Sequence, residues 1–203
     1  DALQRDGAGL VACGVLPARA HVVALPAIAP QHLQMLRRLA GCIELHVYAL
    51  NPCAEYWFEI VSPRRLSALR LQGRAQAHET GNPWLAAWGR QTQAQLEALV
   101  AIDDDGTTDT TDFRPAGGTT LLARVQDAVL DLQELEPGSV RLAADDRSVE
   151  LHVCHSLARE LEVLQDRLLG LLAADPTLRA GDILVALPDL AAAAPLIDAV
   201  FGT

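Results

Sequence analysis

Residues 20–50 contain two short apolar runs on either side of a helical pattern, and this order restricts the fold more than any other feature. The first run, AHVVAL (20–25), is β-branched, and the second, IELHVYAL (43–50), alternates apolar and polar side chains. Between them, PQHLQMLRRLAGC (30–42) spaces its leucines at helical intervals and contains a glycine stop signal. A crossover of this length lets the two strands run in the same direction. The sequence therefore predicts a βαβ unit and a parallel sheet.

The same order recurs at the C-terminal end of the chain. VELHVCH (149–155) is predicted to be a strand, and the leucine stripe that follows predicts a long helix with Ser156 as its N-cap. ILVALPD (183–189) is almost continuously apolar, which is typical of a strand buried on both faces of a parallel sheet. LAAAAPLIDAVFG (190–202) is predicted to be a closing helix. A second strand–helix–strand unit is therefore expected.

The central residues are predicted to be mainly helical. GNPWLAAWGRQTQAQLEALVAI (81–102) begins a helix with Asn82 as its N-cap and proline at the first helical position, and residues 119–135 form another. Two polar stretches, 103–118 and 136–148, are predicted loops, and the second marks a domain boundary. The apolar face of the first helix carries Leu85, Trp88, Leu96 and Leu99.

All sixteen basic residues are arginine, and the formal net charge is −10. A P-loop needs a lysine on the β- and γ-phosphates, and a Schiff-base enzyme needs a lysine amine. Both chemistries are therefore excluded within these residues. Since phosphate contact needs clustered cations, a free-standing domain this acidic is not expected to bind nucleic acid nonspecifically.

The sequence also predicts where such a chain functions. No apolar run approaches the roughly 20 residues of a membrane span, and no signal-peptide pattern is visible. Four widely spaced cysteines form no CxxC pair, which argues against a disulfide framework or a zinc site and favours a cytoplasmic location. Because residue 1 is not methionine and the last predicted helix closes at the end of the sequence, we expect a piece of a longer polypeptide.

The junction at His155 and Ser156 joins a predicted strand directly to a helix, where α/β proteins often hold a phosphate or a nucleophile. No glycine flanks Ser156, and nucleophile elbows and dinucleotide loops both need glycines there. A helix cap is therefore the favoured interpretation. His152, Cys154 and His155 suggest a metal site, but on a strand only the first two share a face. We predict a packed strand, with no metal-binding and no catalytic residue.

Three further groups of residues each have a functional and a simpler interpretation. Asp103–Asp105 lacks the pattern of a calcium loop and is interpreted as a solvated loop. Trp84 and Trp88 are four residues apart on an amphipathic helix, which favours a core or an interface over base stacking, whereas Trp57 is the better stacking candidate. A basic group of four arginines either binds phosphate or forms a solvated helix face paired with acidic neighbours. This group comprises Arg64, Arg65, Arg70 and Arg74.

Three blocks of the sequence resemble the RecC family, the gamma subunits of exodeoxyribonuclease V, the RecBCD helicase–nuclease. LPARAHVVALPAIAPQHLQMLRRLAGCIELHVYALNPCAEYW (16–57) is the first, GNPWLAAWGR (81–90) the second, and residues 146–202, from DRSVELHVCHS to the C-terminal AVFG, the third. They follow the same order as in the family and cover most of the chain. The loop regions near 64–80 and 103–120 carry little of the resemblance.

The resemblance implies an α/β, parallel-sheet fold, because the N-terminal region of RecC is similar to a superfamily 1 helicase (P-loop NTPase-like) whose ATPase motifs have been lost. Residues 1–139 are then expected to be the later part of a first motor-like domain, with a helical insertion at about 64–135. Residues 140–203 would start a second, incomplete one, and HSLARELEVL (155–164) resembles its equivalent in UvrD-like and AddB-type proteins. On this resemblance, Asn51-Pro52 would stand where an active helicase carries its acidic metal-binding motif.

The function implied by the resemblance is accessory. Such a chain is expected to scaffold the complex, split the duplex and hold the 3′ strand during the search for Chi, beside RecB-like and RecD-like subunits. No cofactor is expected here, with ATP and Mg²⁺ bound only on those partners, and the Chi-reading residues lie largely outside this segment. A purely structural protein-interaction segment is the alternative that the negative charge favours, and an active helicase or nuclease domain is disfavoured. The expected DNA-binding residues, besides the four arginines, are Asn51, Trp57, His155 and Arg159.

Overall fold

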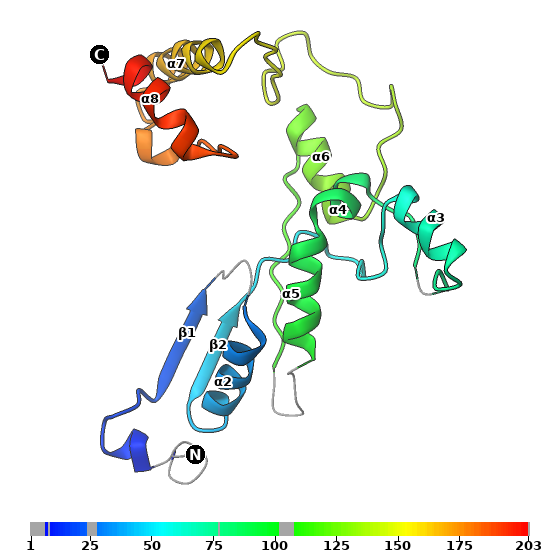
Figure 1. Cartoon of the computed structure of the whole chain (residues 1–203), viewed down its shortest axis with the longest axis vertical. Helices are drawn as coiled ribbons and strands as arrows, with labels where there is room; N and C mark the ends of the chain where they lie inside the picture. The colour runs from blue at the N-terminus through cyan, green and yellow to red at the C-terminus, as the bar shows by residue number, and fades with distance from the viewer. Residues whose placement is uncertain (1–6, 8, 24–27, 77, 102–107, 203) are drawn as a thin grey trace. The chain divides into compact units, whose positions relative to one another are not determined.

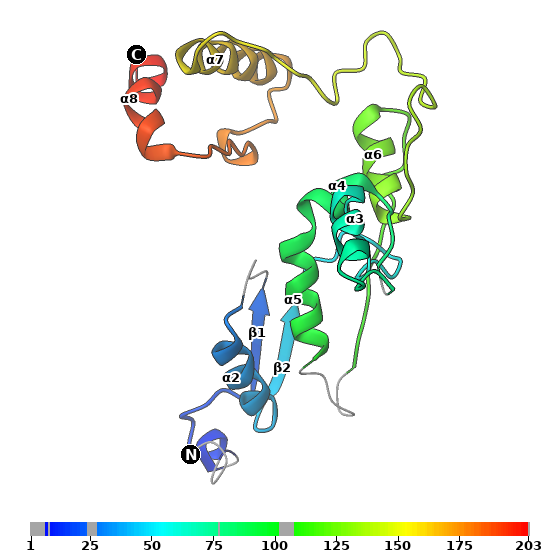
Figure 2. The ribbon, with the colours of Figure 1, turned by 45° about the vertical axis from the view of Figure 1, so that its right-hand side comes forward.

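A computed structural model of the chain describes residues 7, 9–23, 28–76, 78–101 and 108–202. The chain divides into two compact units, Asp1–Ser148 and Val149–Thr203, and each is described by itself. The first unit contains a small sheet and several helices (Figures 1 and 2). Its labelled elements are β1 (Arg19–Val23), α2 (Pro30–Ala40), β2 (Glu44–Tyr48), α3 (Pro63–Leu71), α4 (Pro83–Trp88), α5 (Arg90–Val100) and α6 (Leu121–Leu130).

The sheet of the first unit is built from β1 and β2, which pair in parallel with Arg19 opposite Glu44 and Val23 opposite Tyr48. α2 connects the two strands, lies against β2 (Figure 1), and buries Leu33 and Leu36. The predicted βαβ crossover is therefore confirmed. Within the described ranges the named strands form a two-stranded sheet, so the fold is mixed α/β with a small parallel sheet.

One face of this sheet is polar and carries a row of rings. The rings of His21 and His46 stack with centroids 4.8 Å apart, and His21 Nδ1 lies 3.1 Å from the hydroxyl of Tyr48. Arg19 donates to the Glu44 carboxylate at 2.8 Å, and this bond, with one from His46, holds the pKa of Glu44 below its usual value. Cross-strand pairs therefore stabilise a face that β1 and β2 leave largely exposed.

The predicted helix over residues 81–102 is instead two helices, α4 and α5, which meet at Gly89. A Cβ atom at this position would lie 2.7 Å from a ring carbon of Trp57 and 2.6 Å from the carbonyl oxygen of Leu85. Glycine thus permits the close approach of the indole at the helix junction. Trp88, just before the break, is 79 % exposed, so the core alternative is wrong for this ring and the interface alternative stays a prediction, whereas Leu85 is buried.

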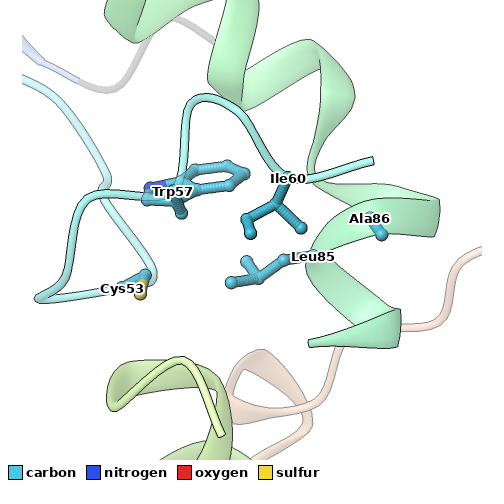
Figure 3. Close-up of a cluster of buried hydrophobic side chains, with 5 residues drawn as sticks. All are labelled: Cys53, Trp57, Ile60, Leu85 and Ala86. Atoms are coloured by element: carbon cyan, nitrogen blue, oxygen red, sulfur yellow. The ribbon is translucent and has the colours of Figure 1, made fainter. Parts of the chain in front are cut away.

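The main core of the first unit forms where the irregular segment 51–60 meets α4 (Figure 3). Leu96 of α5 and Val129 of α6 pack against it, so the core joins three helices to one loop. A second, smaller cluster anchors α3 through Leu66 and Leu69. The buried residues of the main cluster are Cys53, Trp57, Ile60, Leu85 and Ala86.

Asp146 connects the polar stretch after α6 back to the start of that helix. Its carboxylate accepts hydrogen bonds from the backbone N–H of Ser148 at 2.9 Å and of Leu121 at 2.8 Å. These bonds, with a further one from the Ser148 side chain, lower the pKa of Asp146. The carboxylate therefore supplements the N-cap of α6, which Thr120 provides through a bond from the N–H of Ala123.

The low pKa of Asp146 predicts a local acid sensitivity. Because the pKa is lower in the folded than in the unfolded chain, the carboxylate stabilises the fold above its unfolded-state pKa of about 3.9, and this contribution is lost as pH falls through the folded value. Asp146→Asn should therefore flatten the decline in melting temperature at acid pH. Thermal unfolding at a series of pH values checks this, with the exposed neighbour Asp145→Asn as the matched control. Equal pH profiles for the two variants would contradict the assignment.

The second unit contains α7 (Leu157–Ala174), a short 3₁₀ turn η1 (Ala180–Asp182) and α8 (Leu190–Phe201). α7 and α8 pack against each other, and the side-chain amide of Gln165 donates to the carbonyl of Val200 at 2.7 Å. The predicted cap at Ser156 is confirmed, because its hydroxyl accepts a hydrogen bond from the N–H of Arg159. The opening residues of this helix are therefore fixed by ordinary capping.

The two strands predicted in this unit are not formed. Residues 149–155 and 183–189 follow irregular paths (Figure 1), and Leu151, Val153 and Leu184 are about nine-tenths exposed. A strand needs a neighbouring backbone for its hydrogen bonds, and no described segment of this chain provides one here. The prediction that 183–189 is buried on both faces is therefore wrong for this chain. Among the helices that the structure describes, none is long and apolar enough to cross a membrane.

Candidate nucleic-acid interface

Asn51 and Trp57, both predicted to contact DNA, contact each other in the first unit, where Trp57 belongs to the core and Asn51 is partly buried. The indole of Trp57 is 1 % exposed, and its Nε1–H donates to the side-chain oxygen of Asn51 at 3.0 Å. The same oxygen accepts from the backbone N–H of Cys53 at 3.3 Å. A base could therefore stack on Trp57 only if this cluster opened. The structure corrects the prediction of an accessible stacking ring, and the pair holds the segment after β2 in place.

A buried polar network around this cluster was only partly visible in the sequence. The predicted cap at Asn82 is confirmed, with its side-chain oxygen accepting from the N–H of Trp84 and Leu85. Asn82 is also fully buried, and its amide donates to the carbonyl of Gln133 at 2.8 Å, beyond the end of α6. The N-cap could be predicted because it depends on residues next to Asn82. The hydrogen bond to Gln133, 51 residues later, could not be predicted from the local sequence.

Two further residues of this network carried no sequence signal. The amide of Gln93 donates to the carbonyl oxygens of Trp57 and Phe58 and so ties α5 to the segment before α3. The thiol of Cys53 donates to the carbonyl oxygen of Leu130 at 3.3 Å, and burial raises the pKa of this thiol. Cys53 is therefore a neutral packing residue, in keeping with its complete burial.

The four predicted arginines lie on α3 and just after it, and we call them the α3 arginine patch. α3 begins at Pro63 with Ser62 as its N-cap, and Leu66 and Leu69 bury its inner face. The guanidinium groups are exposed, and none of them forms an ion pair or a side-chain hydrogen bond with a described residue. The members of the patch are Arg64, Arg65, Arg70 and Arg74.

Several other arginines differ from this patch because a carboxylate already neutralises them. Arg19 pairs with Glu44 at 2.8 Å, Arg179 pairs with Asp182 at 3.1 Å, and Arg167 pairs with Glu150. A guanidinium with no local counter-ion keeps its donors available for a phosphate or an external carboxylate. In a chain with a formal charge of −10, the α3 arginine patch is thus a local site of positive potential.

His155 and Arg159, the candidates of the second unit, line an open groove of about 630 Å³. The other lining residues are 151–154 and Val163 of α7. Arg159 pairs with Glu162 at 2.8 Å, and this hydrogen bond raises the pKa of the guanidinium further. Arg159 therefore has a neutralising partner that the members of the α3 arginine patch lack.

The sequence offered two groups of possible metal ligands, Asp103–Asp105 and the histidine and cysteine residues at 152–155. Asp103–Asp105 lies outside the described residues. Within the described part of the chain, no group of three or more histidine, cysteine, aspartate or glutamate side chains could hold a metal ion. His152 lies 3.5 Å from the carboxylate of Glu150, which gives it an ion-pair geometry rather than a cluster of ligands.

Comparison with known proteins shows the family. The family model of the RecC N-terminal domain matches residues 11–132. The RecBCD enzyme subunit RecC of Escherichia coli (strain K12) is 32 % identical over 224 residues, which cover 93 % of this chain and 20 % of that protein. The same subunit of Mycobacterium tuberculosis (strain H37Rv) is 36 % identical over 199 residues, with coverages of 92 % and 17 %. The chain spans about a fifth of the length of these curated relatives. It belongs to the RecC family.

Proposed function

We propose that this chain is part of a RecC-type subunit of a RecBCD-type complex, and that it acts in the repair of DNA double-strand breaks. Its role is that of a non-catalytic, helicase-like scaffold that holds and channels unwound DNA and supports Chi recognition. Membership of the RecC family supports this role, since the relatives are named as subunits of the RecBCD enzyme. The partners are then RecB-like and RecD-like subunits and DNA at the junction of single strand and duplex.

The proposal of a motor-like fold without motor chemistry has two supports. The β1–α2–β2 crossover is the parallel unit from which P-loop NTPase sheets are built. No residue of the sequence is a lysine, so these residues lack the side chain that binds the β- and γ-phosphates in a P-loop. ATP and Mg²⁺ therefore bind on the partner subunits in this proposal.

The α3 arginine patch is the single observation that best supports DNA contact by this chain. Its four exposed guanidinium groups lie within eleven residues of sequence, and they have no counter-ion among the described residues. Arginine forks match phosphate oxygens in a bidentate way and bind the backbone without regard to sequence. The patch therefore suits a scaffold that holds a strand, whereas His155 and Arg159 stay candidates for a second contact.

Removal of the α3 arginine patch is expected to reduce the salt dependence of DNA binding. Each phosphate contact contributes about −0.7 to the slope of log K against log salt for a single strand, so the quadruple Arg→Gln variant should lose up to roughly 3 units of slope. The measurement is fluorescence anisotropy of a fork with single-stranded tails, with the full-length subunit in its assembled complex. The matched control replaces four other exposed arginines of the first unit, Arg37, Arg90, Arg124 and Arg141.

An unchanged slope in the patch variant, or an equal loss in the control, would contradict DNA contact through α3. The net charge of −10 favours a second candidate function, in which the patch binds an acidic surface of a partner subunit. In that case the patch variant should assemble more weakly with the other subunits in sedimentation experiments, while the salt slope of the complexes that do form stays the same.

A further inference from the structure

The outward face of α3 carries an exposed apolar side chain among the arginines of the α3 arginine patch. Leu71, the last residue of the helix, is 91 % exposed, whereas Leu66 and Leu69 are buried on the inner face. Arg64 lies seven residues before Leu71, which is about two turns of an α-helix, so the two residues share a face. A cationic and an apolar side chain are therefore exposed on the same face of α3.

Small side chains lie between Arg64 and Leu71. Ser67 and Ala68 are three and four residues after Arg64, on the same outward face, and both are exposed. The Ser67 hydroxyl donates to the carbonyl of Pro63 at 2.9 Å, so it lies close to the helix backbone. The four outward residues, which we call the α3 outer stripe, are Arg64, Ser67, Ala68 and Leu71. Over about 10 Å of helix, a longer side chain therefore bounds each end of a flat middle.

Two further members of the α3 arginine patch flank the α3 outer stripe. With about 100° of rotation per residue, Arg65 and Arg70 fall on opposite sides of it. Both are exposed, and neither forms an ion pair or a side-chain hydrogen bond with a described residue. The charge of this surface therefore complements a polyanion, and its apolar end complements a flat apolar group carried by that polyanion.

A single nucleic-acid strand combines phosphates with such a group. The faces of an unpaired base are open, so the base can stack on a guanidinium plane or against an apolar side chain. In a duplex, neighbouring bases cover these faces, so an exposed leucine on a helix gains no such contact. An exposed leucine between arginines therefore favours a single strand over a duplex as the ligand.

We infer that the α3 outer stripe binds one unpaired base of a single strand, with Leu71 against one face of the base and the Arg64 guanidinium group against the other. Arg65 and Arg70 hold the phosphates on either side of that base. Leu71 is then a specificity-determining residue, because it gives the α3 arginine patch a preference for a single strand over a duplex. The inference rests on the proposed DNA contact through α3 and adds a base contact to it.

Fluorescence anisotropy of the full-length subunit with two single strands of equal length, oligothymidylate and its abasic counterpart, tests this inference. Leu71→Ala should weaken the binding of oligothymidylate by about 5-fold, near the lower end of what one stacking contact contributes, and should leave the binding of the abasic strand unchanged. Leu71→Phe, which supplies a flat apolar side chain, should bind oligothymidylate at least as tightly as the unmodified subunit. The matched control is Val100→Ala, at the last residue of α5 and 65 % exposed, which should bind both strands normally.

Three binding results would overturn the base contact: an equal loss of affinity for the two strands in Leu71→Ala, unchanged affinity for both strands, or an equal loss in Val100→Ala. Weaker assembly of Leu71→Ala with the other subunits, at unchanged DNA affinity, would overturn it as well and would identify an acidic protein surface as the occupant. A reduced salt slope in the quadruple arginine variant, together with unchanged binding by Leu71→Ala, would overturn the base contact and keep the proposed DNA contact. An unchanged salt slope in the quadruple variant would remove both.

Discussion

Replacement of Trp57 by alanine is expected to lower the free energy of unfolding of the first unit by about 3–5 kcal/mol. The indole is 1 % exposed and packs with Cys53, Ile60 and Leu85, so its removal leaves a large cavity. The variant also removes the Nε1–H that donates to Asn51. Segment 51–60 has no regular secondary structure to hold it. The loss of the indole and of its hydrogen bond should therefore unfold this segment first.

Trp88→Ala is the matched control for this prediction, because Trp88 is 79 % exposed on the neighbouring helix α4. It should change the free energy of unfolding by less than about 0.5 kcal/mol. Urea denaturation followed by far-UV circular dichroism compares the two variants without reliance on tryptophan fluorescence. Equal destabilisation by the two substitutions would contradict the burial of Trp57 and would reopen its role as a stacking ring.

A third variant separates packing from DNA contact at this position. Trp57→Phe keeps an aromatic ring. It loses part of the side-chain volume and the whole hydrogen bond to Asn51. If Trp57 acts only in the core, this variant should be destabilised by less than Trp57→Ala and should bind single-stranded DNA as tightly as the unmodified protein. A weaker affinity at full stability would show that a base reaches the ring.

Features set by neighbouring residues were predictable from the sequence. The βαβ crossover was predicted from two strand-like apolar runs, the helical spacing of the leucines between them and a connection of suitable length. It is present as β1, α2 and β2. The caps at Asn82 and Ser156 follow from side chains that accept hydrogen bonds from the N–H groups two or three residues later. Such signals lie within one turn of the chain, so no distant residue is needed to interpret them.

Features that depend on distant residues were predicted less well. The strands expected at 149–155 and 183–189 are absent because a strand is a property of a pair, and this chain contains no described partner for them. The break between α4 and α5 lies at Gly89, which the indole of Trp57, over 30 residues earlier in the chain, approaches closely. The helical spacing of apolar residues continued across Gly89 and did not distinguish the exposed Trp88 from the buried Leu85.

In the candidate site, too, features that depend on neighbouring residues were predicted better than features that depend on distant ones. Four arginines in a short segment without acidic neighbours indicated a basic group, and the structure exposes them on α3 and just after it. Trp57 was a candidate because its segment has no periodic pattern that would have revealed its burial. Its partners come from α4, α5 and the end of α6, and only their assembly decides that the ring is covered.

The buried network explains how an irregular segment can stay fixed in a unit with so little sheet. Asn51, Asn82 and Gln93 each use a side-chain amide to hold backbone or indole groups that regular structure does not satisfy. Backbone and indole groups cost free energy when they are buried without a hydrogen-bond partner. Each of these amides therefore stabilises the fold, and its removal would leave the groups that it binds unsatisfied. Of the three residues, Asn82 is expected to contribute most to stability. It is fully buried, caps α4 and donates to a carbonyl just beyond the end of α6.

Asn82→Ala is therefore expected to destabilise the first unit by about 2–4 kcal/mol, through a lost N-cap and an unsatisfied carbonyl at Gln133. Thr120→Ala, which removes the N-cap of α6 at an exposed position, is the matched control and should cost only about 1 kcal/mol. Asn82→Asp keeps the oxygen that caps α4 but replaces the donor to Gln133, so it should also be destabilising at neutral pH. Urea denaturation of the three variants measures these differences. If Asn82→Ala costs no more than Thr120→Ala, the amide acts as a cap alone, and the link between α4 and α6 contributes nothing to stability.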